Sequence, residues 1–344
     1  MATIKDVAAL AGISYTTVSH VVNKSRPVSD PVRLKVEAAI AQLDYVPSAV
    51  ARSLKARSTA TIGLLVPNSI NPYFAELARG IEDYCERKGY CVILCNSDDD
   101  PQKQRSYIRV LLEKRVDGLI VSSVGGECAL AQSLATTHTP LVILDRALPG
   151  LEADLVTIDN EQGGYLATHH LLELGHRDIA CVTGPLHNSA GQQRLAGFVR
   201  ALKDAGLNAA PGRIVESDFS SPGGYDAAAQ LLAQSAAEGA PTAIFACNDM
   251  MGMGVLRAAA ERGIRVPGQL SVIGFDDIQI CRFVYPALTT VGQSIRQLGE
   301  MAAERLLQRV RKVVTGACEQ RLITPAIVTR ESTAALGSPF HEYR

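Results

Sequence analysis

The chain has 344 residues, of which 47 % are hydrophobic and 20 % are charged, as is ordinary for a globular protein with two or three domains. No apolar run approaches the roughly 18 residues that a membrane-spanning helix needs, which argues against an integral membrane protein. Charged Lys5 and Asp6 stand where the apolar core of a secretion signal would begin, so we expect a cytoplasmic protein.

The distribution of charge is uneven, although the net charge is only −1. Residues 1–60 carry eight Lys or Arg and four Asp or Glu, a net charge of +4, and the remainder carries −5. A small basic head on an acidic body suggests a polyanionic partner for the head alone.

Three short helices are predicted in the head. Apolar spacing favours a first helix over Ile4–Ala11, and Gly12 can adopt the left-handed conformation that ends a helix. Ser14 is a good N-cap for a second helix that runs to about Val22. A third helix, over about 31–43 and preceded by Ser29 as its cap, would close a small core. Two short helices joined by a turn with glycine are typical of a helix-turn-helix.

The second helix carries hydrogen-bonding side chains on its exposed side, namely Tyr15, Thr16, Ser19 and His20. A helix that enters the major groove of DNA needs donors and acceptors in this position. A solvated helix face is the alternative for any isolated case. The turn, the third helix and the basic charge together favour DNA binding.

A short helical segment over 48–55 follows the head and contains Arg52 and Lys55. It is either an exposed linker helix or a hinge that orders on DNA and pushes Leu54 between base steps of the minor groove. We therefore divide the chain into a helix-turn-helix head (1–46), a hinge and linker (47–60) and a body (61–344).

Head and hinge together resemble the N-terminal signature of the lac-repressor/galactose-repressor family of bacterial transcription factors, in the stretches TIKDVAALAGIS…TTVSHVVN and YVPSAVARSLK. The resemblance extends over nearly the whole chain. It implies base-edge contacts in the major groove, phosphate contacts and a minor-groove wedge. The resemblance implies that Tyr15, Thr16 and His20 contact base edges and that Asn23 contacts phosphates. It implies that Leu54, with Lys55 beside it, is the minor-groove wedge.

The body alternates short apolar strands with amphipathic helices, which predicts parallel sheets covered on both faces. One set of strands is expected at 61–66, 91–96, 118–123 and 141–145, and a second, after Gly163, at 179–184, 243–248 and 270–276. Two such sets favour a two-lobed α/β core. In open α/β sheets, ligands bind beyond the carboxyl ends of the strands.

The residues that follow the predicted strands, together with those at the ends of two further strand-like runs, RIVESDF (213–219) and LTTVG (288–292), are aromatic, carboxylate, amide and guanidinium side chains. They are Asn71, Tyr73, Phe74, Asp145, Arg146, Arg194, Phe219, Asn248, Asp276 and Gln293. A sugar ring needs this combination, because carboxylates and amides bind hydroxyls, Arg donates to oxygens, and aromatic rings pack on C–H faces. For any single member, an ordinary loop residue or a helix cap is the alternative.

The body is similar to a periplasmic ribose-binding protein, and the ten residues match that protein's ribose contacts. One departure is Tyr73, where the binding protein has Phe. The Asp145-Arg146 pair favours a sugar, because purine-binding relatives do not carry Arg at this position. Head and hinge look equally like ribose and purine repressors, so the DNA-binding end does not distinguish the effectors.

Other classes of protein fit less well. The sequence has no G-x-S-x-G, P-loop or Rossmann fingerprint, and MGMG at 251–254 lacks the third glycine, so we expect no enzyme and no cofactor. His169, His170 and His176 lack a partner set for a metal, and a solvated helix face is the expected role. The eight cysteines form no C-x-x-C pair, so we expect mostly buried free thiols. A transport binding protein would lack the head.

The sequence thus predicts a homodimeric repressor of a ribose or other pentose utilisation operon. It would bind pseudo-palindromic double-stranded DNA and be released when D-ribose or a close relative occupies the cleft between the lobes. The alternative is a repressor of purine or nucleoside genes that uses a purine corepressor. The tail from Ser332 onward has no leucine heptads, so we expect no tetramerisation helix.

Overall fold

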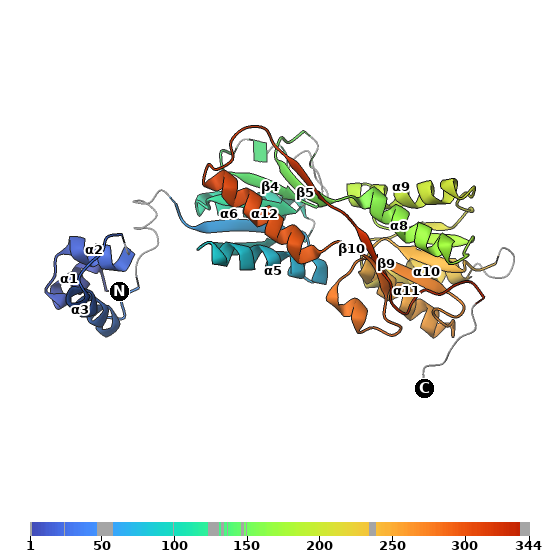
Figure 1. The fold of residues 1–344 in the computed structure, drawn as a ribbon, viewed down its shortest axis with the longest axis horizontal. Coiled ribbons are helices and arrows are strands. Elements are labelled where there is room, and N and C mark those ends of the chain that lie inside the picture. The colour runs from blue at the N-terminus through green and yellow to red at the C-terminus, as the bar shows by residue number, and fades with distance from the viewer. Residues whose placement is uncertain are drawn as a thin grey trace. The chain divides into compact units, whose positions relative to one another are not determined.

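The computed structural model describes residues 2–23, 25–46, 58–98, 100–122, 131, 134–135, 137–145, 148, 150–233 and 239–337. Contacts divide the chain into two compact units, Met1–Ala60 and Thr61–Arg344. Figure 1 labels elements of both units.

The head consists of the helices α1 (Ile4–Ala11), α2 (Tyr15–Asn23) and α3 (Asp30–Gln42). A capping box between Thr3 and Asp6 begins α1, and Gly12 ends it with φ of 66°. Ser14 begins α2, since its Oγ accepts the backbone N–H of Thr17 at 3.2 Å. Ser29 precedes α3, but its side chain makes no capping hydrogen bond, contrary to expectation.

The three helices enclose a small apolar core. Val7, Val18, Val36 and Ala39 are buried there, one or two from each helix. Because each helix is too short to be stable alone, this shared core holds the helix-turn-helix together. The predicted head fold is confirmed.

One sheet of the body has the strand order β11-β5-β4-β3-β1-β2, with all neighbours parallel. Its strands are β1 (Thr61–Val66), β2 (Cys91–Asn96), β3 (Gly118–Ser122), β4 (Leu141–Leu144), β5 (Asp154–Ile158) and β11 (Gln320–Ile323). The helices α5 (Pro72–Arg87), α6 (Pro101–Glu113) and α12 (Ile295–Val310) pack on it. Leu64 and Leu65 of β1 belong to different apolar clusters, so both faces are buried. We call this sheet with its helices the first lobe.

The second lobe has the strand order β12-β10-β9-β8-β6-β7. Its strands are β6 (Ile179–Thr183), β7 (Ile214–Glu216), β8 (Ala243–Ala246), β9 (Ser271–Asp276), β10 (Thr289–Gly292) and β12 (Ala326–Val328). Only β12 of these is antiparallel, to β10. The covering helices are α8 (Asn160–Glu173), α9 (Ser189–Asp204), α10 (Ser221–Ala233) and α11 (Asp249–Glu261), and a 3-10 turn, η1 (Gln279–Arg282), precedes β10. Helix pairs α8/α9 and α10/α11 pack closely.

The chain does not complete one lobe before it begins the other. After β10, helix α12 and strand β11 return to the first lobe, and β12 then rejoins the second (Figure 1). Helix α12 packs against α5 at a glycine crossing: a Cβ on Gly80 would lie 2.3 Å from the Arg296 carbonyl oxygen, and one on Gly299 would lie 2.4 Å from that of Leu77. Asp154 of β5 also binds Arg305 at 2.8 Å. These contacts between residues far apart in the sequence explain why α12 returns to the first lobe.

The buried side chains include a histidine and most of the described cysteines. His176 is buried against the oxygens of Thr242 and Ser271, both at 3.0 Å, so a solvated helix face was wrong for this residue. Five of the seven cysteines in the described ranges are buried, and those seven are free thiols. Within the same ranges, no helix is long and apolar enough to cross a membrane, and no cluster of three metal-ligating side chains occurs.

Candidate functional site

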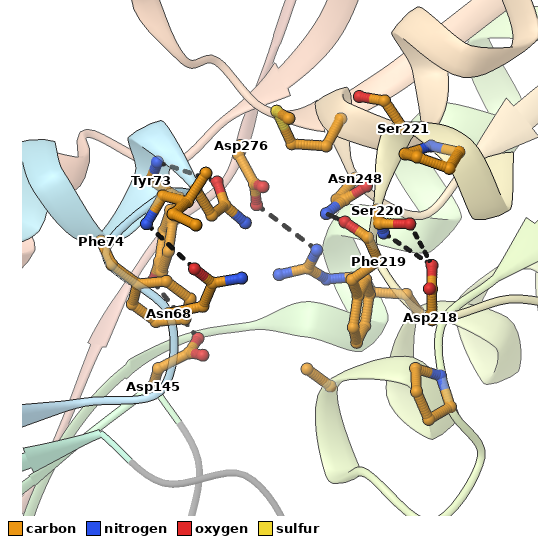
Figure 2. Close-up of a pocket in the computed structure, with 17 residues that line it drawn as sticks. Asn68, Tyr73, Phe74, Asp145, Asp218, Phe219, Ser220, Ser221, Asn248 and Asp276 are labelled. Carbon is orange, nitrogen blue, oxygen red and sulfur yellow. Dashed lines mark hydrogen bonds and ion pairs between the residues drawn. The ribbon is translucent and has the colours of Figure 1, made fainter. Parts of the chain in front are cut away.

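A cavity of about 270 Å³ lies between the two lobes, at the carboxyl ends of their strands (Figure 2). Eight of the ten residues predicted as effector contacts line it: Asn71, Tyr73, Phe74, Asp145, Arg194, Phe219, Asn248 and Asp276. Gln293 is buried, does not line the cavity and donates a hydrogen bond to Asp276. Arg146 is outside the described residues.

The first lobe contributes an aromatic wall. Asn71 caps α5 by accepting the backbone N–H of Tyr73 at 3.0 Å, which places two rings at the start of the helix. Tyr73 and Phe74 pack edge to face with 5.0 Å between ring centroids. The Tyr73 hydroxyl donates to Oδ1 of Asp145 at 3.3 Å. The wall therefore ends in a carboxylate at the end of β4.

Phe219 forms the opposing aromatic wall from the second lobe, as Figure 2 shows. Its backbone has φ of 65°, held by a turn in which Asp218 accepts the Ser220 N–H at 2.9 Å. Its ring lies over Gly184, where a Cβ would be only 2.0 Å from the ring. Asn248 fixes the Phe219 carbonyl by donating Nδ2 across 2.9 Å.

Two of the predicted amides are also helix caps. Asn248 begins α11 by accepting the Met251 N–H at 2.8 Å, as Asn71 begins α5. The structural alternative weighed for these residues therefore holds, although both still line the cavity. The side-chain oxygens of these amides each accept a backbone N–H of the helix that they begin, and the Asn248 amide also holds the Phe219 carbonyl.

Arg194 and Asp276 form a buried ion pair at the centre of the site. Arg194 donates Nε to Asn160 at 2.8 Å and Nη1 to the Cys247 carbonyl at 2.6 Å, and Nη1 lies 3.4 Å from Oδ1 of Asp276. The guanidinium also lies 3.7 Å above the Phe275 ring. Burial raises the pKa of Asp276 well above its usual value, and the Arg194 charge opposes this.

Three residues that line the cavity have strained backbone. Asp145, Phe219 and Asp276 have φ of 70°, 65° and 121°, all in the range that residues other than glycine rarely adopt. Such conformations persist where the surrounding structure determines them, and they are common at ligand sites. Two of these three strained residues are the carboxylates that face the cavity from opposite lobes.

Asp249 belongs to the core rather than to the cavity. It is fully buried, accepts the Thr290 hydroxyl at 2.5 Å and the Ile278 N–H at 3.0 Å, and does not line the cavity. Burial raises its pKa to about 7. It therefore forms no catalytic carboxylate pair with Asp276, which agrees with the expectation of a binding site.

Sequence reasoning missed about half of the lining. The additional residues are Asn68, Ile70, Pro185, Ala190, Asp218, Ser220, Ser221, Pro222 and Met250. Asn68, Pro185 and Asp218 each follow a strand end by two residues, so a stricter use of the strand-end rule would have found them. The remainder lie in loops or early helical turns, whose approach to the cavity depends on the tertiary fold.

Four of the six predicted DNA contacts lie on helix α2 of the head. Tyr15 is 53 % exposed, Thr16 and Asn23 are exposed, and His20 is half-buried. Asn23 donates Nδ2 to the Ser19 carbonyl at 2.9 Å within α2. Leu54 and Lys55 lie outside the described residues.

Comparisons with known proteins agree with this architecture. Residues 3–48 match the model of bacterial regulatory proteins of the lacI family, and residues 168–333 match a periplasmic binding protein-like domain. The HTH-type transcriptional repressor PurR of Aliivibrio salmonicida (strain LFI1238) is 44 % identical over 339 residues, covering 98 % of this chain and all of the relative. The chain belongs to the lacI family of bacterial regulatory proteins.

Solved structures of this lacI family extend the similarity. The lac repressor dimer bound to operator and the anti-inducer ONPF has a TM-score of 0.87 at 31 % identity, covering 97 % of this chain and 99 % of that one. A LacI family regulator from Enterococcus faecium with bound ribose has a TM-score of 0.70 at 35 % identity, covering 80 % and 99 %. The predicted fold class is therefore confirmed.

The family assignment makes the protein a DNA-binding transcription repressor and not an enzyme. The narrower expectation of a ribose operon repressor as nearest relative is not supported, because relatives that match over nearly the whole chain, at 44 % and 42 % identity, are PurR proteins. In this respect the similarity favours the alternative that the sequence left open.

Proposed function

We propose that the protein represses transcription by binding a pseudo-palindromic operator as a homodimer, and that a small molecule in the interlobe cavity controls this binding. The exposed polar face of α2 and the basic head support DNA binding. The lac repressor structure, a dimer on operator, supports the assembly by analogy. Such a repressor acts in the bacterial cytoplasm, where the DNA is.

The effector that the cavity's chemistry favours is D-ribose or a close pentose. The observation that carries this proposal is the pair of carboxylates, Asp145 from the first lobe and Asp276 from the second. A carboxylate accepts hydrogen bonds, and a pentose offers several hydroxyl donors around one ring. Phe74 and Phe219 supply apolar faces for the ring, and Arg194 can donate to a sugar oxygen. The ribose-bound relative supports the same class.

A purine base is the second candidate, and whole-chain similarity supports it better than it supports ribose. The observation in its favour is the identity of 44 % to PurR over the full length. A flat purine could stack between Phe74 and Phe219, with Arg194 donating to a ring nitrogen or oxygen. In that case the few N–H groups of the base would have to donate hydrogen bonds to both Asp145 and Asp276.

Either effector would act by joining the two lobes. A ligand with partners on both walls binds the closed arrangement better than the open one and so shifts the population towards it. By linkage, operator and effector must alter each other's affinity by the same factor, typically ~5–150-fold. A sugar would release the operator, whereas a purine corepressor would strengthen operator binding.

Calorimetric titration with D-ribose, hypoxanthine and guanine, each alone, tests the effector. We expect micromolar binding of D-ribose and no heat from either base. The matched variant Asp145→Asn should lose ribose binding by at least about tenfold, since hydrogen bonds to a charged group are the stronger kind. Purine binding without ribose binding would replace the pentose proposal by the corepressor one. Fluorescence anisotropy with operator DNA then gives the direction of the response.

A further inference from the structure

The C-terminal end of α2 folds back over one of its own predicted DNA-reading residues. The backbone N–H of Ser25 donates to the His20 carbonyl at 3.2 Å, a bond that spans six residues and closes the helix end. The Ser25 hydroxyl also lies 2.8 Å from Nδ1 of the His20 ring. Ser25 therefore contacts His20 twice, once through the backbone and once through its side chain.

The second contact determines how the imidazole can be used. An imidazole has two ring nitrogens, and a partner on one of them restricts both the ring's orientation and the tautomer presented by the other. With Nδ1 held by Ser25, Nε2 is the nitrogen left to meet a base edge. A serine hydroxyl both donates and accepts, so it can support either neutral tautomer.

We propose that Ser25 is a positioning residue for sequence readout: it holds the His20 ring so that Nε2 contacts a base edge in the major groove. This inference rests on the proposed function, in which His20 reads the operator. A side chain that is already ordered before binding does not lose conformational entropy when the complex forms. This is worth roughly two- to tenfold in affinity. Because only the base contact of His20 benefits, we expect the gain in affinity to appear as discrimination at one base position of the operator.

The surroundings of the pair offer a competing role for Ser25. A shallow hollow at this end of the head is lined by His20 and Ser25 together with Arg26 and Arg33. Arg33 is already paired with Asp30 at 2.9 Å and Glu37 at 3.0 Å. A hydroxyl beside arginines could instead bind a phosphate, but such a contact would not depend on base sequence. The hydroxyl's short distance to the His20 ring favours positioning.

The test uses the full-length protein and a consensus operator selected from random duplexes by the wild type. Dissociation constants are then measured for every single-base change in one half-site, with wild type, His20→Ala, Ser25→Ala, Ser25→Thr and the His20→Ala/Ser25→Ala double variant. Ser25→Ala removes only the side-chain contact, since any residue except proline keeps the backbone N–H. Ser29→Ala is a matched control, because Ser29 is an exposed serine of the same head whose side chain makes no capping bond.

We expect His20→Ala to remove discrimination at one base position. Ser25→Ala should weaken discrimination at that same position by roughly two- to tenfold, have no further effect in the His20→Ala background, and be rescued by Ser25→Thr. Uniform weakening on all sequences, effects that multiply in the double variant, or no change in Ser25→Ala would each overturn the proposal. The proposal would also be overturned if the wild type selects a clear consensus and His20→Ala keeps the same base preferences. A wild type that selects no consensus would instead overturn the proposed function itself.

Discussion

Gln293 donates its side-chain amide to Oδ1 of Asp276 across 2.6 Å, and the Arg194 guanidinium lies 3.4 Å from the same oxygen. Gln293 is buried and does not line the cavity, so it acts on a ligand only through Asp276. Because both neighbours contact Oδ1, Oδ2 is the oxygen that we expect an effector hydroxyl to meet. Gln293, directly after β10, thus holds the Asp276 carboxylate in place at the end of β9.

Replacing the central carboxylate should separate effector response from DNA binding. Asp276→Asn keeps the shape of the side chain but replaces one oxygen with an amide group that can only donate, so effector affinity should fall by at least about tenfold. Operator affinity without effector should change little, because the head folds around its own core. Calorimetry and anisotropy measure the two properties, with Asp204→Asn, at the exposed end of α9, as control. An undiminished response to effector would mean that the cavity is not the effector site.

Gly184 should be needed for the position of the Phe219 ring. A methyl group in Gly184→Ala would lie 2.0 Å from that ring, so the ring must move out of its place in the aromatic wall. We expect effector affinity to fall by about tenfold, since the ring's packing against a ligand is lost. Titration calorimetry on the variant measures this, and unchanged operator binding serves as the internal control. Wild-type effector affinity would show that Phe219 does not contact the ligand.

His176 should make the body less stable at acidic pH. Burial lowers the pKa of His176 below 6.5, so the folded chain keeps it neutral while the unfolded chain takes up a proton. The contribution of His176 to stability is therefore fully present above the pKa that it has in the unfolded chain. It is lost as the pH falls through 6.5 towards the lower pKa of the folded chain. His176→Asn should be less stable near neutral pH but lose less on acidification.

Urea unfolding at about pH 7.5 and about pH 5.5 measures both effects on stability. His170 remains in the variant, and burial lowers its pKa as well, so some pH dependence should persist. An identical loss in wild type and His176→Asn would exclude His176 as a contributor.

Leu54 should matter for affinity more than for base preference. If it enters the minor groove at the centre of the operator, Leu54→Ala removes the wedge that kinks the DNA and should weaken specific binding. The major-groove preferences of α2 should stay nearly the same, because its side chains are untouched. Affinity across the single-base operator set tests both statements. Wild-type affinity in Leu54→Ala would rule out the wedge.

The local parts of this protein could be predicted from its sequence. The helix α1 begins and ends where its capping box and Gly12 specify, because a helix end depends on groups within about one turn. The strands β1 and β2 coincide with apolar runs in the sequence. Eight predicted residues line the cavity because parallel strands bring their carboxyl ends to one edge, whatever the order of the strands.

The tertiary structure alone decided how the lobes share the chain. Strands β5, β11 and β12 were not expected, and the return of α12 to the first lobe depends on its crossing with α5 at Gly80. The tertiary structure also decided that Gln293 supports Asp276 instead of facing the cavity. Such relationships join residues far apart in the sequence through packing, and a pattern within one segment carries no information about the partner that will cover it.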